Sequence, residues 1–424
     1  MASSGNLNTK VLDALTRLAE TLAQLDERGF KDVGESSSSP AQRLHGHETA
    51  MDEITRTSAA LTLSQADSNA PQSTAPTTQL SHYRIQPPAL VEAYALLTTG
   101  SQYIHATSTK YTLVSKIDYE TEGGNLAVEL RKGAELLGTA TLAVFSPEMG
   151  CGPSAKRYVK QFSRGVIASV ISLVEAFENG SAIGGAENHV GAQKTGAVWS
   201  ACDAIQQLPK GNRNSMRREC MVWIRDCMES VTEFEDIMKS GEREDAEGED
   251  EDDMIEEEMY TPVEMKIVRA AVNVMKCSKN VLGLVMKACD CVGECIENLT
   301  TSDSTEIPNS NDATVSRDNK TEMLQWIYAL HEVARSIGEG VTDFGILLYP
   351  PLDLSDSPTE SSLSQQLNNQ LQALEKCVTC IHDSSFPLSG MSMQSCMSDE
   401  VVEMTERLLN GIKTRVAEVK SAMS

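Results

Sequence analysis

Apolar residues recur alternately four and three positions apart over a long segment in the second half of the chain. The spacing holds for Met323, Ile327, Leu330, Ala334, Ile337, Val341, Phe344 and Leu348. Because an α-helix has about 3.6 residues per turn, these residues share one helix face, whereas a strand needs alternation at every second residue. The segment therefore predicts a long helix with one buried face. Pro350-Pro351 should end it, and Gly338 and Gly340 are candidates for a bend.

The same periodicity predicts helices through most of the chain. They cover 154–178, 194–208, 213–240, 363–381 and 402–419. A further helix should start at Thr261, because Thr-Pro-Val-Glu places a capping threonine before a proline and a glutamate three residues after the cap. This helix is apolar over a wide face, so we expect it near the middle of a bundle. Residues 89–145 are less regular; we expect helices there too, with a turn at Gly123-Gly124.

An acidic run at residues 241–258 separates two halves of the chain. It holds twelve acidic residues and one Arg, so it cannot collapse on itself and should stay solvated. Weak binding of a basic partner or of cations is the less favoured interpretation of this run. Aromatic residues make up only 4% of the chain, which favours a helical core of Leu, Val, Ile, Met and Ala over a β-sandwich.

The predicted helices and the acidic run between them indicate an all-α protein with two helical-bundle domains joined by an acidic linker. The expected order is an N-terminal heptad helix in 1–30, a Ser/Pro-rich linker with one short helix in 31–88, an N-terminal helical bundle in 89–240, the acidic linker in 241–260, and a C-terminal four-helix bundle in 261–424.

The heptad helix carries the only residues that the sequence singles out for partner binding. Its apolar stripe consists of Val11, Leu15, Leu18, Leu22 and Leu25. Two heptads are marginal as a free coiled coil, so this face needs a covering surface. Packing in cis as one more bundle helix is the favoured interpretation. The alternative is that the stripe is offered to a helix of a partner.

No catalytic, cofactor or metal site is expected. Cys377, Cys380 and His382 lack a fourth ligand at zinc spacing, and Cys289, Cys291 and Cys295 fit no zinc or iron–sulfur pattern, so both groups are interpreted as core cysteines. The sequence has no P-loop, GxSxG or HExxH motif. An enzyme is therefore the remote interpretation.

The net charge of −25 disfavours direct binding to nucleic acid or to anionic lipid. Eleven scattered cysteines, no apolar signal region and no apolar run of membrane-spanning length indicate a reducing compartment, the cytosol or nucleus. Ser39-Pro40 and Ser357-Pro358 lie in expected loops, so both serines are candidate phosphorylation sites. The oligomeric state is not indicated.

Three segments of the chain are distinctive in combination. The first is 198–238, with Val198-Trp199, then Ala201-Cys202 and a Leu-Pro break before a long helix. The second is the acidic run after that helix. The third is 341–354, which contains Tyr349-Pro350-Pro351. In this order the segments resemble the family of cyclin-D-binding proteins, also described as Grap-and-cyclin-D-interacting proteins, and the resemblance covers roughly 130–424.

This resemblance implies helical bundles of four to five helices similar to those of vinculin, talin and α-catenin. It implies binding to D-type cyclins and to helix-loop-helix transcription factors, residence in cytoplasm and nucleus, and restraint of cell-cycle progression. The expected mechanism is sequestration, in which an apolar helix face pairs with a partner's helix. A cytoskeletal adaptor is the competing interpretation, because similar bundles bind actin and fold alone does not decide function.

Overall fold

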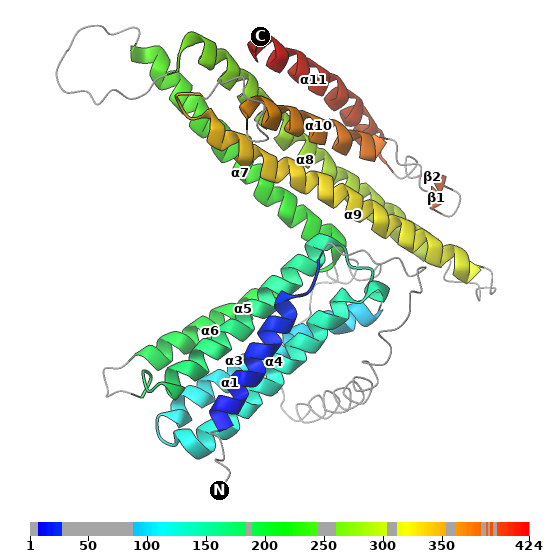
Figure 1. Cartoon of the computed structure of the whole chain (residues 1–424). Coiled ribbons are helices and arrows are strands. Elements are labelled where there is room, and N and C mark those ends of the chain that lie inside the picture. Colours follow the sequence, from blue (N-terminus) through cyan, green and yellow to red (C-terminus); the bar gives the residue numbers. More distant parts are fainter. Residues whose placement is uncertain are drawn as a thin grey trace, which may run out of the picture. The chain divides into compact units, whose positions relative to one another are not determined.

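The computed structural model is helical in nearly all of the residues that it describes (Figure 1), which confirms the predicted all-α class. It describes residues 7–27, 88–183, 189–244, 260–302, 312–352, 362–382, 387–388, 391–392 and 397–423. A two-residue antiparallel pair, β1 (Pro387–Leu388) and β2 (Met391–Ser392), is the small departure from this pattern. The expected linker and short helix in 31–88, Ser39 and Ser357 all lie outside the described residues.

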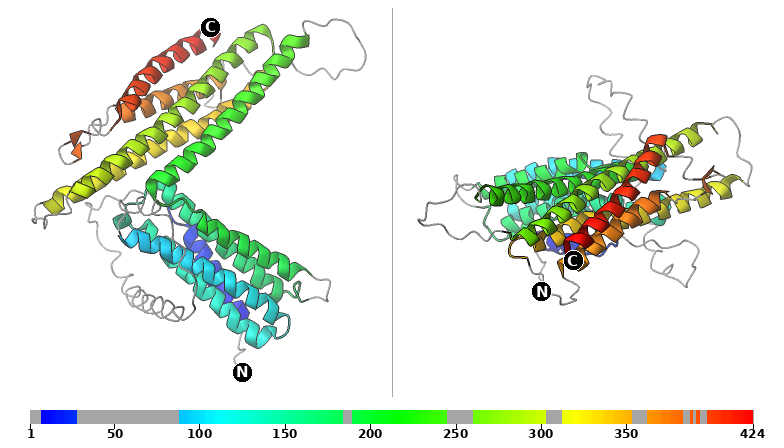
Figure 2. Two further views of the ribbon diagram at one scale, coloured as in Figure 1. Left: turned by 180° about the vertical axis from the view of Figure 1, so that it is seen from behind. Right: turned by 90° about the horizontal axis from the view of Figure 1, so that it is seen from above.

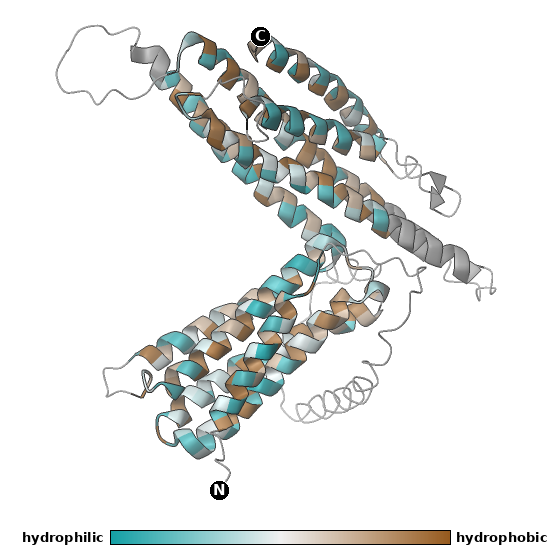
Figure 3. Ribbon diagram, in the orientation of Figure 1, coloured by the Kyte–Doolittle hydropathy of each residue, from teal (hydrophilic) through white to brown (hydrophobic). Residues whose placement is uncertain are grey.

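The chain divides into two compact units. Unit 1 comprises Met1–Cys151 and Lys156–Leu208, and unit 2 comprises Gly152–Ala155 and Pro209–Ser424. In each unit the described helices run side by side (Figure 2), and hydrophobic residues line them (Figure 3). None of the described helices has an apolar stretch that could cross a membrane.

Unit 1 is built from five described α-helices. They are α1 (Leu7–Ala23), α3 (Pro88–Ser115), α4 (Gly124–Phe145), most of α5 (Pro153–Glu178) and α6 (Val190–Gln206). Short helical turns η3 (Tyr119–Gly123) and η4 (Pro147–Met149) precede and follow α4. The predicted turn at Gly123-Gly124 is wrong, because both glycines are right-handed helical and the chain turns at residues 116–118. The side chain of Asp118 accepts a hydrogen bond from the Thr121 N–H and so starts η3.

Unit 2 contains the remaining helices of the described chain. They are α7 (Gly211–Glu244), α8 (Pro262–Ser302), α9 (Asp312–Gly345) with the short turn η5 (Ile346–Leu348), α10 (Leu363–His382) and α11 (Asp399–Met423). Helix α8 contacts each of α7, α9, α10 and α11, which confirms its expected central place. Its apolar faces are buried between these neighbours.

Helix α7 belongs to unit 2, which differs from the expected N-terminal bundle of 89–240. Its core stripe, with Trp223, Cys227 and Phe234, packs into the same hydrophobic core as α8. The break between the units therefore lies near Leu208-Pro209, and unit 2 has one helix more than the expected four. Residues 241–244 of the acidic run continue α7, and residues 245–259 lie outside the described chain.

Gly338 allows α7 and α9 to pack closely, and α9 continues as a helix through it to Gly345. A Cβ atom at Gly338 would lie 2.3 Å from Cγ of Trp223, and one at Gly340 would lie 2.2 Å from Oε1 of Gln370. These glycines thus provide room for large neighbouring side chains. Close packing therefore explains why glycine occurs at both positions. The bend that the sequence suggested at Gly338 and Gly340 is not needed to explain them.

The start of α8 forms the predicted capping box. The Glu264 N–H donates to Oγ1 of Thr261 over 3.3 Å, and Oε2 of Glu264 accepts from the Thr261 N–H over 2.7 Å. The other carboxylate oxygen, Oε1, accepts from the N–H of Leu352 over 2.7 Å. Glu264 thus closes the helix start and also ties down the segment that follows η5.

We expect Glu264→Gln to destabilise unit 2 by about 1–2 kcal/mol at neutral pH, because charge-assisted hydrogen bonds become neutral ones. Burial raises the pKa of Glu264, but the hydrogen bonds from Thr261 and Leu352 outweigh it and hold the pKa below its ordinary value. A lowered folded-state pKa stabilises the fold above the unfolded pKa of roughly 4.3, and this stabilisation is lost as pH falls through the folded pKa. Urea unfolding at several pH values should show the two proteins converging in acid; a constant difference would contradict this assignment.

Candidate interaction surface

Helix α7 has a buried side and an outward side, and the two have different chemistry. The buried side faces the core of unit 2 with Met216, Cys220, Trp223, Cys227, Val231 and Phe234. The outward side is solvent-exposed over more than four turns, from Arg217 to Lys239. It is the outward side that could meet another molecule.

Several contacts within unit 2 hold α7 in place. Arg213 and Arg217 donate to the two carboxylate oxygens of Asp290 on α8 over 2.6 and 2.8 Å. Near the other end, Lys276 of α8 pairs with Glu235 over 2.7 Å. A rigidly held helix presents its outward residues with little entropy left to lose on binding.

A buried polar pair also joins α7 to α9. Nε2 of His331 lies 3.1 Å from Oε2 of Glu219, and both side chains are 5% exposed. The Trp223 and His331 rings are tilted neighbours, with centroids 6.1 Å apart. This pair and the Gly338 contact fix the rotation of α7, so the same residues always face outward.

Three apolar side chains stand out on the outward side. Met221 is 52% exposed, Val222 is 37% exposed and Met228 is 42% exposed. Spacings of three, four and seven residues place side chains on one side of a helix, so Met221 and Met228 share a side two turns apart. A cluster of large apolar residues outside the core is typical of a protein-binding surface rather than of a folding requirement.

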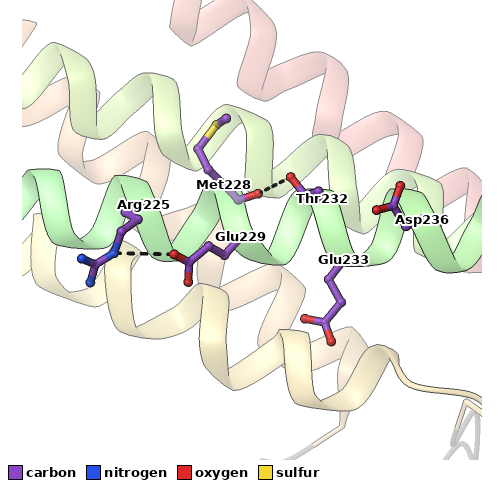
Figure 4. Close-up of a pocket in the computed structure, with 6 residues that line it drawn as sticks. All are labelled: Arg225, Met228, Glu229, Thr232, Glu233 and Asp236. Atoms are coloured by element: carbon purple, nitrogen blue, oxygen red, sulfur yellow. Dashed lines mark hydrogen bonds and ion pairs between the residues drawn. The ribbon is translucent and has the colours of Figure 1, made fainter.

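The charges beside these apolar residues are ordered along the helix. Arg217, Arg218 and Arg225 occupy its first part, and Glu229, Glu233 and Asp236 occupy its second part. We call the exposed set the α7 face: Arg218, Met221, Val222, Arg225, Met228, Glu229, Thr232, Glu233 and Asp236. A shallow depression lies along its second part, lined by Arg225, Met228, Glu229, Thr232, Glu233 and Asp236 (Figure 4).

The Tyr-Pro-Pro segment supports one edge of the α7 face. The hydroxyl of Tyr349 donates to Oε1 of Glu233 over 2.6 Å, and its ring lies 5.3 Å from that of Phe234. The hydrogen bond to Glu233 raises the pKa of Tyr349. The following Pro350-Pro351 peptide is cis. Two of the segments that carried the family resemblance therefore meet at this point of unit 2.

The heptad stripe of α1 is packed within unit 1. Val11, Leu15 and Leu22 are buried, and a Cβ atom at Gly138 of α4 would lie 2.6 Å from Cδ1 of the half-buried Leu18. Leu25 is also half-buried. In the structure the stripe of α1 therefore packs against helices of its own chain. A partner could bind this stripe only after α1 separates from α4.

Polar contacts hold α1 at both ends. Near its start, the buried Asn8 accepts from the hydroxyl of Tyr111 over 3.4 Å and donates to the Tyr119 carbonyl over 3.3 Å. Beyond its end, Nζ of Lys160 donates to the Leu25 carbonyl over 2.6 Å and pairs with Glu27 over 2.8 Å. These contacts add to the apolar burial, so α1 is an integral part of unit 1.

Four of the five cysteines singled out in the sequence lie in or beside the core of unit 2. Cys377 is buried and Cys380, Cys289 and Cys291 are half-buried, while the side chain of Cys295 is outside the described residues. Burial raises the pKa of the Cys377 thiol, and it raises that of Cys289 to about 12. Such thiols stay protonated and unreactive at neutral pH. Over the described ranges, His, Cys, Asp and Glu do not gather into a metal-ligand group.

A sequence profile identifies part of the chain. Residues 96–239 match the family described as Grap2 and cyclin-D-interacting, N-terminal. Over these residues the chain is similar to the N-terminal region of that cyclin-D-interacting family. The resemblance seen in the sequence is thereby confirmed over those residues. A search of curated proteins finds no match to the chain.

The region matched to the cyclin-D-interacting family runs from α3 into α7 as far as Lys239, so it includes the whole α7 face. It also includes Trp199 of α6, which is partly exposed and stacks on His105 of α3 with ring centroids 5.3 Å apart. Neither surface was singled out from the sequence. Met221 and Met228 do fall outside the core stripe of their helix, which is the signal that could have found them.

Proposed function

We propose that this protein is a non-enzymatic regulator that binds a D-type cyclin through the α7 face and withholds it. The observation that carries the proposal is the exposure of Met221, Val222 and Met228 on a helix inside the region matched to a cyclin-D-interacting family. The family description supports the class of partner. The structure of unit 2 supports the choice of surface.

The α7 face fits an amphipathic helix of the partner. Methionine side chains are flexible and polarizable, so Met221 and Met228 can adapt to an apolar ridge. Arg218 and Arg225 would meet acidic residues at one end of that ridge, and Glu229, Glu233 and Asp236 would meet basic residues at the other end. Such charge order sets the direction of the bound helix and suppresses wrong partners.

Sequestration is the mechanism that this surface supports best. A helix held against α7 cannot engage another protein at the same time, so the partner is withdrawn from its usual complex. The same mode would serve for a helix-loop-helix factor, because a chain with a net charge of −25 adds no contacts to DNA phosphates and its complex with the factor would bind DNA weakly. We place this activity in cytoplasm and nucleus, with restraint of cell-cycle progression as its outcome.

The proposal is tested by the double variant Met221→Glu/Met228→Glu. Glutamate is a good helix former, so the helix should persist while its apolar surface is removed. We expect binding of a purified D-type cyclin–kinase complex, measured by calorimetry, to weaken at least about tenfold. Leu113→Glu, at an exposed apolar residue of α3, is the matched control and should bind as the parent protein does.

Unchanged cyclin affinity in the folded double variant would exclude the α7 face as the docking surface. Affinity purification from cells provides a broader check of partner class. Recovery of a cyclin or a helix-loop-helix factor agrees with the proposal. Recovery of actin-associated proteins in their place would favour the cytoskeletal interpretation instead.

A further inference from the structure

The charge order on the α7 face is self-complementary. Reading along α7, the exposed arginines Arg218 and Arg225 come first, and the exposed acids Glu229 and Asp236 follow at matching intervals. Two copies of such a helix, placed side by side in opposite directions, bring the basic part of each against the acidic part of the other. This is the property that a two-fold symmetric interface requires, because the same patch must complement itself.

The register of such a pair follows from the sequence. Arg225 and Glu229 lie two residues on either side of Cys227, and Arg218 and Asp236 lie nine residues on either side of it. A two-fold axis at the level of Cys227 therefore places Arg225 opposite Glu229 of the partner subunit. The same axis places Arg218 opposite Asp236 of the partner subunit. Symmetry repeats both pairs, which gives four intermolecular ion pairs.

The apolar residues of the face suit the same register. Met228 is one residue from the level of the axis, so the two Met228 side chains would start about 3 Å apart along the helix direction. Met221 of each copy extends this contact outward on the same flank. Val222 falls opposite Thr232 of the partner subunit, where the threonine methyl group can meet it. The Met228 contact and the Arg225–Glu229 pairs therefore lie nearest the centre of the interface, Val222 and Met221 lie farther out, and the Arg218–Asp236 pairs lie at its ends.

We propose that the α7 face also docks a second copy of this chain, as an antiparallel and two-fold symmetric helix pair. Within one copy, Nε of Arg225 reaches Oε1 of Glu229 only at 3.7 Å, and both side chains are more than half exposed. An ion pair of that kind contributes little and is easily exchanged for one in a second copy. Asp236 is likewise paired within one copy, with Lys239 at 3.1 Å, and exchanging exposed pairs of this kind for intermolecular ones costs little.

The dimer should be weak and sensitive to salt. A face on one helix is smaller than a standard interface, which buries about 1,600 Å² in total, so dissociation in the micromolar range or above is expected. Its charge pairs lie at the surface, where ions screen them. Because the dimer covers Met221 and Met228, it would compete with a cyclin; this regulatory consequence rests on the proposed function, whereas the self-pairing does not.

Two charge-reversed full-length chains test the pairing. Arg218→Glu/Arg225→Glu makes the α7 face acidic, and Glu229→Lys/Asp236→Lys makes it basic. We expect each variant alone to dimerise at least about tenfold more weakly than the parent chain in analytical ultracentrifugation. An equimolar mixture of the two should form a heterodimer, because each reversed face now complements the other. All four positions are exposed, so both variants should keep the circular dichroism and melting temperature of the parent.

The expected geometry is checked by cross-linking Met228→Cys and Val222→Cys chains under mild oxidation. Only the first places the introduced thiols beside the two-fold axis, so only it should form the symmetric disulfide, identified by peptide mapping. A parent chain that stays monomeric to about 1 mM at low salt would overturn the proposal. So would variants that associate as the parent does or fail to pair when mixed. No cyclin is present in these experiments, so their results test the self-pairing independently of the proposed function.

Discussion

Gly338→Ala should destabilise unit 2 by about 2–3 kcal/mol, although alanine is the better helix former. The new methyl group would lie between 2.3 and 2.7 Å from three atoms of the Trp223 indole, which is itself buried in the core. The ring cannot turn away without displacing the α8 side of the core, so α7 and α9 must move apart. Urea unfolding followed by tryptophan fluorescence measures the loss.

Gly283→Ala is the matched control, because a methyl group at this glycine of α8 has no atom within 4 Å. The control should be neutral or more stable by roughly 0.5–1 kcal/mol, since glycine is the poorer residue inside a helix. Combining Gly338→Ala with Trp223→Leu should cost less than the sum of the two single changes, because the removed indole was the obstacle. Equal stabilities of the two alanine variants would contradict close packing at Gly338.

Leu15→Asp should release α1 and destabilise unit 1 by about 4 kcal/mol or more. Leu15 has no exposed surface, so the substitution removes a buried aliphatic side chain and places a carboxylate against α4 without a partner. The amides of α1 should lose their protection in hydrogen exchange first, because the helix is too short to persist alone. Hydrogen exchange detected by mass spectrometry resolves this effect from changes in unit 2.

Thr16→Asp introduces the same side chain one residue further on, at an exposed position, and should leave stability within about 0.5 kcal/mol. If the two variants were equally stable, the stripe would not be buried in solution, and the partner-binding interpretation of α1 would regain support. A loss of cyclin binding in Leu15→Asp alone would not identify a docking face, because the variant disturbs the unit that contains it.

Most helices could be predicted from the sequence, because the apolar residues on the buried face of a helix recur every three or four positions. The stripes predicted α5 to α11, and the Thr261 to Glu264 capping box is formed as expected. The turn before α4 could not be located in this way. Gly123 suggested it, but Asp118 accepts from Thr121 and starts the η3 turn earlier, while Gly123 packs against the Ser115 hydroxyl. Here the glycine serves close packing rather than a turn.

The candidate surface could not be predicted because a stripe shows that a helix has a buried face, but not which helix covers it. The stripe of α7 is as regular as that of α1, yet α7 packs with α8 across the acidic run. For the heptad stripe of α1, packing in cis was the favoured interpretation, but only the structure shows that α4 is the helix that covers it. Met221 and Met228 lie outside the predicted stripe of α7, but only the structure shows that no described helix of unit 2 covers them.

The division of the chain at Leu208-Pro209 has a consequence for synthesis on the ribosome. All the helices described for unit 1 are complete when residue 208 has been made, so this unit can fold at once. Helix α7 follows immediately, but α8 arrives only after the acidic run. During that interval Trp223 and Phe234 have no core to enter. We expect the charged run beside them to keep the emerging segment soluble, so that its acidity protects the nascent chain as well as separating two helices.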